Sequence, residues 1–201
     1  MSIPEDGVRT PPFALQLDIS EAAIELHRAA LREATYLGSA KKPADELTGR
    51  DLETLVGISV RLEEELASAK KQADFLRRIF DDYPDWVNDR VRAALESEHL
   101  NAADSEKVRQ VLKVEDNDFA GHGKTLCESF IHQVSTERLE LRDQAFALRD
   151  QGVLDPETAH STGCKLLGLA ILGGLATCFP TEGAGCVVAL GATIAYVGFG
   201  C

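Results

Sequence analysis

The sequence predicts an all-α protein: an N-terminal helical bundle or coiled-coil hairpin followed by a hydrophobic C-terminal helical hairpin. Apolar residues recur at helical spacing through residues 20–151, and residues 1–160 show no convincing strand alternation. Two nearly uncharged apolar runs, separated by a polar turn, follow. We therefore divide the chain into an irregular arm (1–19), an acidic helical domain (20–152) and a hydrophobic, Cys- and Gly-rich peptide (161–201).

The first helix is predicted after an arm whose first 18 residues contain three prolines. Ser20 is the expected N-cap, because its hydroxyl can accept a hydrogen bond from the first turn, and Gly38 is the expected end. Apolar residues between them recur on one helical face.

The strongest helical pattern covers residues 51–82. Its stripe alternates steps of three and four residues, which is typical of a coiled coil and also of a bundle helix. The stripe can pair with a second long helix predicted over 125–151, or with another copy of the chain in a homo-oligomer. Its members are Leu52, Leu55, Ser59, Leu62, Leu66, Ala69, Ala73, Leu76 and Phe80.

Shorter elements are predicted between these two helices. Pro84 marks a turn, Asp85 is a plausible cap for the next helix, and another helix is expected around 105–114. Residues 115–123, "EDNDFAGHG", are expected to form a polar loop, with Thr125 near the following helix cap.

The net charge of the chain is strongly negative, and it is distributed unevenly along the sequence. The formal net charge is −12, which argues against binding to nucleic acid and against electrostatic docking on anionic lipid. Lys165 and Glu182 are the only charged residues from 161 to 201, so the negative excess belongs to residues 1–160. The first twenty residues do not resemble a signal peptide, which places the full-length chain in the cytoplasm.

No motif indicates an enzyme, a cofactor or a metal site. "GHGKT", residues 121–125, resembles part of a phosphate loop, but Asp118 stands where that motif needs glycine. Cys127 and His132 are five residues apart, which places them poorly for a shared helical face. We expect Cys127 to be a reduced thiol in the core.

Cysteines bracket both apolar runs of the C-terminal part. Cys164 and Cys178 flank the first run, and Cys186 and Cys201 flank the second. Four cysteines allow three pairings, of which Cys164–Cys201 with Cys178–Cys186 would staple an antiparallel hairpin. Free cysteines that fill a membrane hairpin, or thioether links to nearby Ser or Thr, are the alternatives. Each run is shorter than the about 20 residues that a straight membrane span requires.

The C-terminal part resembles a bacteriocin precursor, and the nearest family is the halocin-type disulfide peptides. The resemblance rests on "TGC", residues 162–164, and on Gly- and Ala-rich apolar runs punctuated by cysteine. It implies a secreted antimicrobial peptide that acts on target-cell membranes and is released from the carboxyl end by proteolysis. It also implies a processing protease, an exporter and an N-terminal leader or immunity domain.

Release near Ala159, His160 and Ser161 would keep all four cysteines in the peptide, whereas a cut after Gly174 would leave Cys164 behind. Two other hypotheses stay open. The chain could be a helical scaffold that its hydrophobic hairpin anchors to a membrane, or a soluble helical protein whose tail is buried in its own bundle or in an oligomer.

Overall fold

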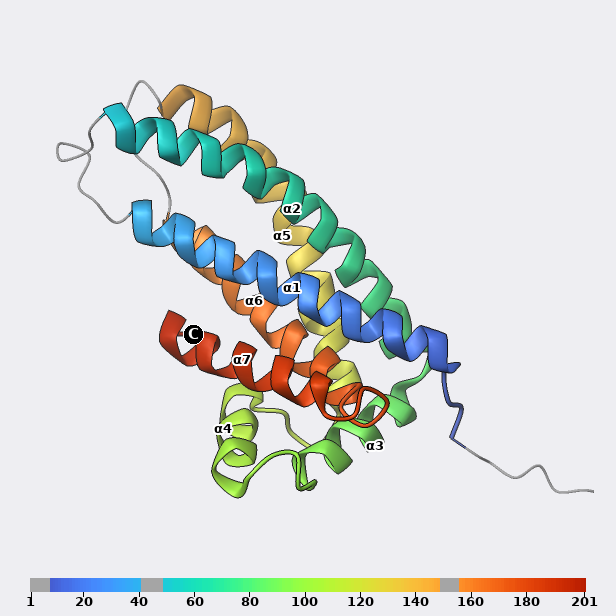
Figure 1. The fold of residues 1–201 in the computed structure, drawn as a ribbon. Helices are drawn as coiled ribbons and strands as arrows, with labels where there is room; N and C mark the ends of the chain where they lie inside the picture. Colours follow the sequence, from blue (N-terminus) through green and yellow to red (C-terminus); the bar gives the residue numbers. More distant parts are fainter. Residues whose placement is uncertain (1–7, 41–48, 149–155) are drawn as a thin grey trace, which may run out of the picture.

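A computed structural model describes residues 8–40, 49–148 and 156–201, with side chains described over 8–32, 64–135 and 160–201. The described residues form helices and no strands, which confirms the predicted all-α class (Figure 1). The helices are α1 (Phe13–Ala40), α2 (Gly49–Asp82), α3 (Pro84–Leu95), α4 (Ala102–Leu112), α5 (Phe119–Leu148), α6 (Pro156–Ala176) and α7 (Ala184–Phe199).

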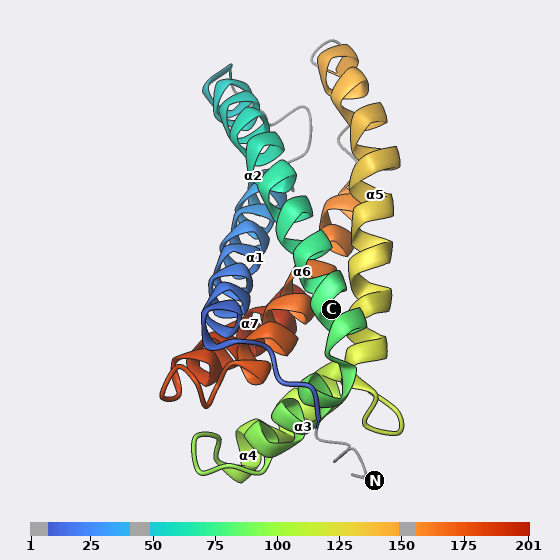
Figure 2. The same ribbon diagram turned by 90° about the vertical axis from the view of Figure 1, so that its right-hand side faces the viewer.

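Helices α1, α2 and α5 are the long elements of the bundle. The views in Figures 1 and 2 show α2 running opposite to both α1 and α5, and it packs against each of them. The part of the predicted stripe with described side chains is buried: Leu66, Ala69, Ala73, Leu76 and Phe80. These five side chains are therefore buried by packing inside the bundle of this one chain.

The centre of the core is α6, which belongs to the hydrophobic C-terminal part. It contacts α1 and α7 most extensively, and it also packs against α5 and α3 (Figure 2). Its apolar side chains are at most 1% exposed on every face: Leu166, Leu167, Leu169, Ala170, Ile171, Leu172, Leu175 and Ala176. A helix that is apolar all round is typical of a buried position, and the bundle provides that position.

The start of α1 differs from the prediction. The helix begins at Phe13, so the irregular arm is shorter than expected, and the helix continues past Gly38 to Ala40. Ser20 is buried inside α1 and is not its N-cap. Pro11 and Pro12 immediately precede the helix, where a fixed φ and a missing N–H are tolerated.

The start of α5 also differs. Residues 119–123 were expected in a loop, but the helix begins at Phe119 and Thr125 lies inside it. The Asp118 carboxylate accepts a hydrogen bond from the Gly121 N–H at 3.0 Å, and the Asn88 side chain accepts one from the Ala120 N–H at 2.9 Å. These two acceptors satisfy amides at a helix start that otherwise lack partners.

The two short helices begin differently as well. Helix α3 has Tyr83 as its N-cap, with Pro84 in the first turn, so Asp85 is not the cap. Helix α4 begins three residues before the expected position, because the Asn101 side chain accepts a hydrogen bond from the Asp104 N–H. The last residues predicted for α5, 149–151, lie outside the described residues.

Candidate functional site

The candidate site is the pair α6–α7, which two disulfides cross-link near its two ends. Cys164 bonds to Cys201 with Cα atoms 5.7 Å apart, and Cys178 bonds to Cys186 with Cα atoms 4.8 Å apart. These are the two pairs favoured from the sequence. Cys127, the remaining cysteine, is free and buried in the core. Both disulfides therefore lie wholly within residues 164–201.

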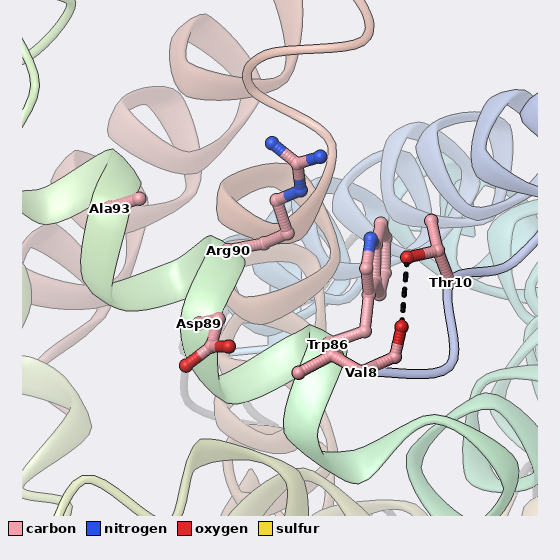
Figure 3. Close-up of a pocket in the computed structure, with 6 residues that line it drawn as sticks. All are labelled: Val8, Thr10, Trp86, Asp89, Arg90 and Ala93. Atoms are coloured by element: carbon pink, nitrogen blue, oxygen red, sulfur yellow. Dashed lines mark hydrogen bonds between the residues drawn. The ribbon is translucent and has the colours of Figure 1, made fainter. Parts of the chain in front are cut away.

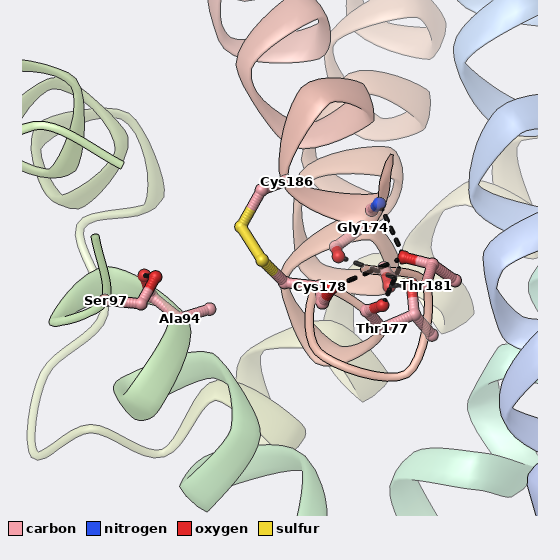
Figure 4. The surroundings of a disulfide bond; sticks show 9 residues. Ala94, Ser97, Gly174, Thr177, Cys178, Thr181 and Cys186 are labelled. Carbon is pink, nitrogen blue, oxygen red and sulfur yellow. Dashed lines mark hydrogen bonds between the residues drawn. A yellow bond between two sulfur atoms is a disulfide. The ribbon is translucent and has the colours of Figure 1, made fainter. Parts of the chain in front are cut away.

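The turn between the helices is organised by threonine hydroxyls. Thr177 donates to the Gly173 carbonyl oxygen at 2.9 Å, and Thr181 donates to the Thr177 carbonyl oxygen at 2.6 Å. The Thr181 oxygen in turn accepts a hydrogen bond from the Gly185 N–H at 2.8 Å. Figure 4 shows these threonines beside the disulfide that closes the turn. The turn thus joins the end of α6 to the start of α7 by hydrogen bonds as well as sulfur.

Glycines allow α6 and α7 to approach closely beside this turn. A Cβ at Gly174 would lie 2.7 Å from the Gly185 carbonyl oxygen, and a Cβ at Gly185 would lie 2.4 Å from the Gly174 carbonyl oxygen. The nearest atom opposite each glycine belongs to backbone, which cannot rotate away as a side chain could. A larger residue at either position would therefore separate the helices.

Helix α7 covers α6 with one face and presents the other to the surface. Val187, Ile194 and Val197 are 70%, 71% and 63% exposed, whereas Ala189 and Ala192 on the opposite face are fully buried. The exposed positions recur at helical spacing and form an apolar stripe. Within the described part of the chain, no helix combines the length and the apolar character that a membrane crossing requires.

The expected processing region lies in helical structure. Ala159, His160 and Ser161 belong to the first turns of α6, which begins at Pro156. His160 is held further: its Nε2 lies 2.9 Å from the Phe199 carbonyl oxygen, and its ring stacks on the Phe199 ring with centroids 5.3 Å apart. A protease that cleaves extended backbone would need this turn to open first.

One constellation was missed from the sequence. His160 and Cys164 are four residues apart and share a face of α6, so the imidazole nitrogens lie 3.9 and 4.0 Å from the Cys164 sulfur. Together with Cys201 they bring three metal-ligating atoms within 4.8 Å of one another. The spacing of four residues in a helix is the signal that could have found the first two; the third depends on tertiary structure.

The cysteine and histidine pair considered from the sequence, Cys127 and His132, does not come together. Cys127 is fully buried and His132 is exposed, so they lie on different faces of α5. Burial raises the pKa of the Cys127 thiol far above its ordinary value, which disfavours the nucleophilic thiolate.

The "GHGKT" segment is built into a helix start whose donors are engaged. The Gly121 amide bonds to Asp118, and the Lys124 ammonium lies 2.6 Å from the Asp81 carboxylate. A Cβ at Gly123 would lie 2.6 Å from the Phe80 ring, so this glycine allows α5 to pack on α2. Gly123 therefore serves helix packing, and Asp118 occupies the Gly121 amide that a phosphate would need.

A small hollow lies beside α3, under residues 8–10 of the N-terminal segment. It has a volume of about 270 Å³, and its lining includes Thr10, Trp86 and Arg90 (Figure 3). Trp86 is buried, and its indole N–H has no hydrogen-bond partner among the described residues. Arg90 also lies over the Phe179 ring, at 5.8 Å from the ring centroid, which links this wall to the α6–α7 turn.

Comparisons of the chain with models of protein families, with curated proteins and with solved structures find no match.

Proposed function

We propose that the chain is the precursor of a ribosomally made, secreted antimicrobial peptide that acts on membranes, with residues 161–201 as the active part. The observation that carries the proposal is the confinement of both disulfides to residues 164–201. Because no disulfide joins this segment to the acidic helices, a cut upstream of Cys164 would leave the hairpin cross-linked and covalently separate. The resemblance to halocin-type peptides supports the same interpretation.

The acidic helices have a role in this proposal as a cover for the hairpin. Helices α1, α3 and α5 pack on α6, and Lys165, the one cation of the tail, donates a hydrogen bond to Gln133 on α5. The leucines of α6 that pack on these helices would be exposed to water after release, at about 1.5–3 kcal/mol for each side chain that becomes fully exposed. Insertion of this face into a lipid surface would recover that free energy.

The length of the hairpin favours action at or within one side of a bilayer. Helix α7 spans about 24 Å at 1.5 Å per residue, which is shorter than the ~30 Å hydrocarbon layer. The hairpin has two apolar surfaces that could contact lipid. One is the exposed stripe of Val187, Ile194 and Val197 on α7, and the other is the face of α6 that the acidic helices cover. The proposal assigns the chain no catalytic step, a cytoplasmic precursor and a secreted product.

Intact-mass measurement of secreted and cell-bound material tests the proposal. We expect a fragment in the medium that begins near residue 161 and gains two hydrogens for each of two disulfides when it is reduced. Loss of water from Ser or Thr would instead indicate thioether links. Only full-length chain, in both fractions and at all growth phases, would contradict the proposal.

A membrane-attached scaffold is the second candidate, because the α7 stripe is exposed in the intact chain. It predicts that full-length protein sediments with vesicles of neutral lipid and that Ile194→Glu together with Val197→Glu abolishes the sedimentation. In that case no short fragment would be found in the medium. The two measurements therefore separate the candidates.

A further inference from the structure

The Cys164–Cys201 disulfide has a histidine beside it, and this neighbourhood forms a cluster of three metal-ligating groups. The ligating atoms of His160, Cys164 and Cys201 all lie within 4.8 Å of one another. His160 and Cys164 come from the start of α6, and Cys201 follows the end of α7. The cluster therefore bridges the two helices at the end opposite the turn.

The imidazole of His160 is oriented for ligation. The Phe199 carbonyl oxygen is 2.9 Å from Nε2 and can only accept a hydrogen bond, so Nε2 carries the ring proton. The Nδ1 lone pair is then free, and Nδ1 lies 3.9 Å from the Cys164 sulfur. Stacking on Phe199 holds the ring plane with an interplanar angle of 3°. A histidine that donates its second N–H to a backbone carbonyl is the arrangement that metal-ligating histidines adopt in proteins.

We propose that, when the Cys164–Cys201 disulfide is reduced, His160, Cys164 and Cys201 bind a zinc ion and hold the ends of α6 and α7 together. Two thiolates and one imidazole match the ligand preference of zinc, and solvent completes the tetrahedral set. The side chain of Cys201 is exposed and those of His160 and Cys164 are half-buried, so the ion has a path from solvent.

The redox step balances with a dithiol reductant. The reductant gives two electrons and two protons, breaks the S–S bond to leave two thiols, and becomes a disulfide itself. Zinc then displaces the two thiol protons as both sulfurs become thiolates. The two Cα atoms, 5.7 Å apart, already lie close enough for one ion to join both sulfurs without backbone movement.

Cys201 faces solvent, because it lines a surface hollow of about 290 Å³ together with Lys107, Lys113 and Tyr196. The other disulfide is different, because Cys178 and Cys186 are fully buried and no cluster of three ligating groups in the described part of the chain includes them.

The metal site does not depend on the proposed function, and the full-length chain tests it directly. The chain with Cys178→Ala and Cys186→Ala would be reduced anaerobically on an immobilised phosphine and then titrated with Co²⁺ alone. We expect one equivalent to bind with thiolate-to-cobalt charge-transfer absorption, which zinc then removes. The same chain with its Cys164–Cys201 disulfide intact should show no such absorption.

Two variants identify the ligands. His160→Gln should weaken Co²⁺ affinity at least tenfold, a loss of the size known for disturbed metal ligation, and Cys164→Ser together with Cys201→Ser should remove the charge-transfer band of the one-equivalent site. His99→Gln is the matched control, since His99 lies beside the Phe179 ring near the other disulfide, and its affinity should be unchanged. Far-UV circular dichroism confirms folding of each variant.

Three results would overturn the proposal: no charge-transfer absorption at one equivalent, equal affinity in His160→Gln, or a band that survives the double change of Cys164 and Cys201 to serine. Because Cys127 is the one thiol left in that double variant, survival of the band would locate the ion elsewhere. Secretion or processing of the chain has no bearing on any of these measurements, so failure here leaves the proposed function standing.

Discussion

Gly174 illustrates how single residues determine the contact between α6 and α7. An added Cβ would meet backbone atoms, 2.7 Å from the Gly185 oxygen and 3.0 Å from the Ala189 nitrogen. Gly198 on α7 is the natural comparison, because nothing lies within 4 Å of a Cβ there. The same substitution should thus have opposite effects at the two glycines.

We expect Gly174→Ala to lower the free energy of unfolding by about 1–3 kcal/mol, the usual cost of overpacking, despite the better helix propensity of alanine. Gly198→Ala should raise it by up to about 1 kcal/mol, because only the propensity term acts. Urea unfolding of the full chain measures both. Equal shifts in the two variants would contradict the close approach of α6 and α7.

His27 gives a pH dependence at the same scale. Burial lowers its pKa below the ordinary value of 6.5, and its ring faces Gly191 on α7. The unfolded chain therefore takes up a proton at a higher pH than the folded chain does. Stability contributed by neutral His27 is present above pH 6.5, decreases as the pH falls below it, and levels off beneath the folded-state pKa.

Chemical unfolding of the wild type and of His27→Gln between neutral and acidic pH measures this contribution. In the variant the free energy of unfolding should decrease less as the pH falls. Part of the decrease should remain, because burial also lowers the pKa of His122. Identical pH profiles for the two proteins would show that His27 titrates normally in the folded chain.

At the scale of elements, the two disulfides of the α6–α7 pair differ in loop length and exposure. Cys164–Cys201 closes a separation of 37 residues and ends at an exposed residue, whereas Cys178–Cys186 closes 8 residues and is buried. The longer loop has more chain entropy to lose in the unfolded state, by the usual model of cross-link stabilisation.

Replacement of Cys164 and Cys201 by alanine should cost about 4 kcal/mol, and replacement of Cys178 and Cys186 about 2.5 kcal/mol, on the chain-entropy scale. Limited dithiol reduction followed by alkylation and peptide mapping tests the difference in exposure. We expect label on Cys164 and Cys201 first. Label that appears first on Cys178 and Cys186 would contradict the buried position of that bridge.

The elements also show what sequence could predict. The stripe from Leu66 to Phe80 predicted α2, because packing on one face requires that period. The start of α5 could be predicted only in part. The Asp118 cap adjoins the helix in the sequence, whereas the Asn88 side-chain oxygen that accepts from the Ala120 N–H comes from α3. Ser20 was misplaced for a local reason: its hydroxyl suits an N-cap, but Pro11 and Pro12 allow a start at Phe13.

The candidate site shows the same division. Cysteines at the ends of two apolar runs predicted the observed pairs, because an antiparallel hairpin brings those ends together. The burial of α6 could not be predicted in detail, since a helix that is apolar all round has no polar face to indicate its neighbours. The position of Cys201 beside His160 likewise depends on how α7 crosses α6.

At the scale of the whole molecule, the acidic helices and the C-terminal hairpin share one core. Residues of α1, α2, α3 and α5 and residues of α6 belong to the same buried apolar cluster. We therefore expect a chain that ends at residue 155 to lose cooperative unfolding and to bind hydrophobic dyes. A sharp thermal transition in that truncated chain would show that the acidic part has a core of its own.

The shared core also predicts the behaviour of a cut chain. When a specific protease site placed within residues 149–155 is cleaved, we expect the two pieces to stay together in gel filtration. Their separation should require denaturant or lipid vesicles, because the covered face of α6 then has another apolar partner. The control is the same variant before cleavage. Spontaneous separation in plain buffer would contradict the shared core.

The central position of α6 has a consequence for biosynthesis. Ribosomes make α6 after α1, α3 and α5, which pack on it, so those helices leave the exit tunnel before their common partner exists. Their apolar faces stay exposed to water, or are bound by chaperones, until α6 emerges from the ribosome. We therefore expect the shared core to form only after α6 has left the exit tunnel.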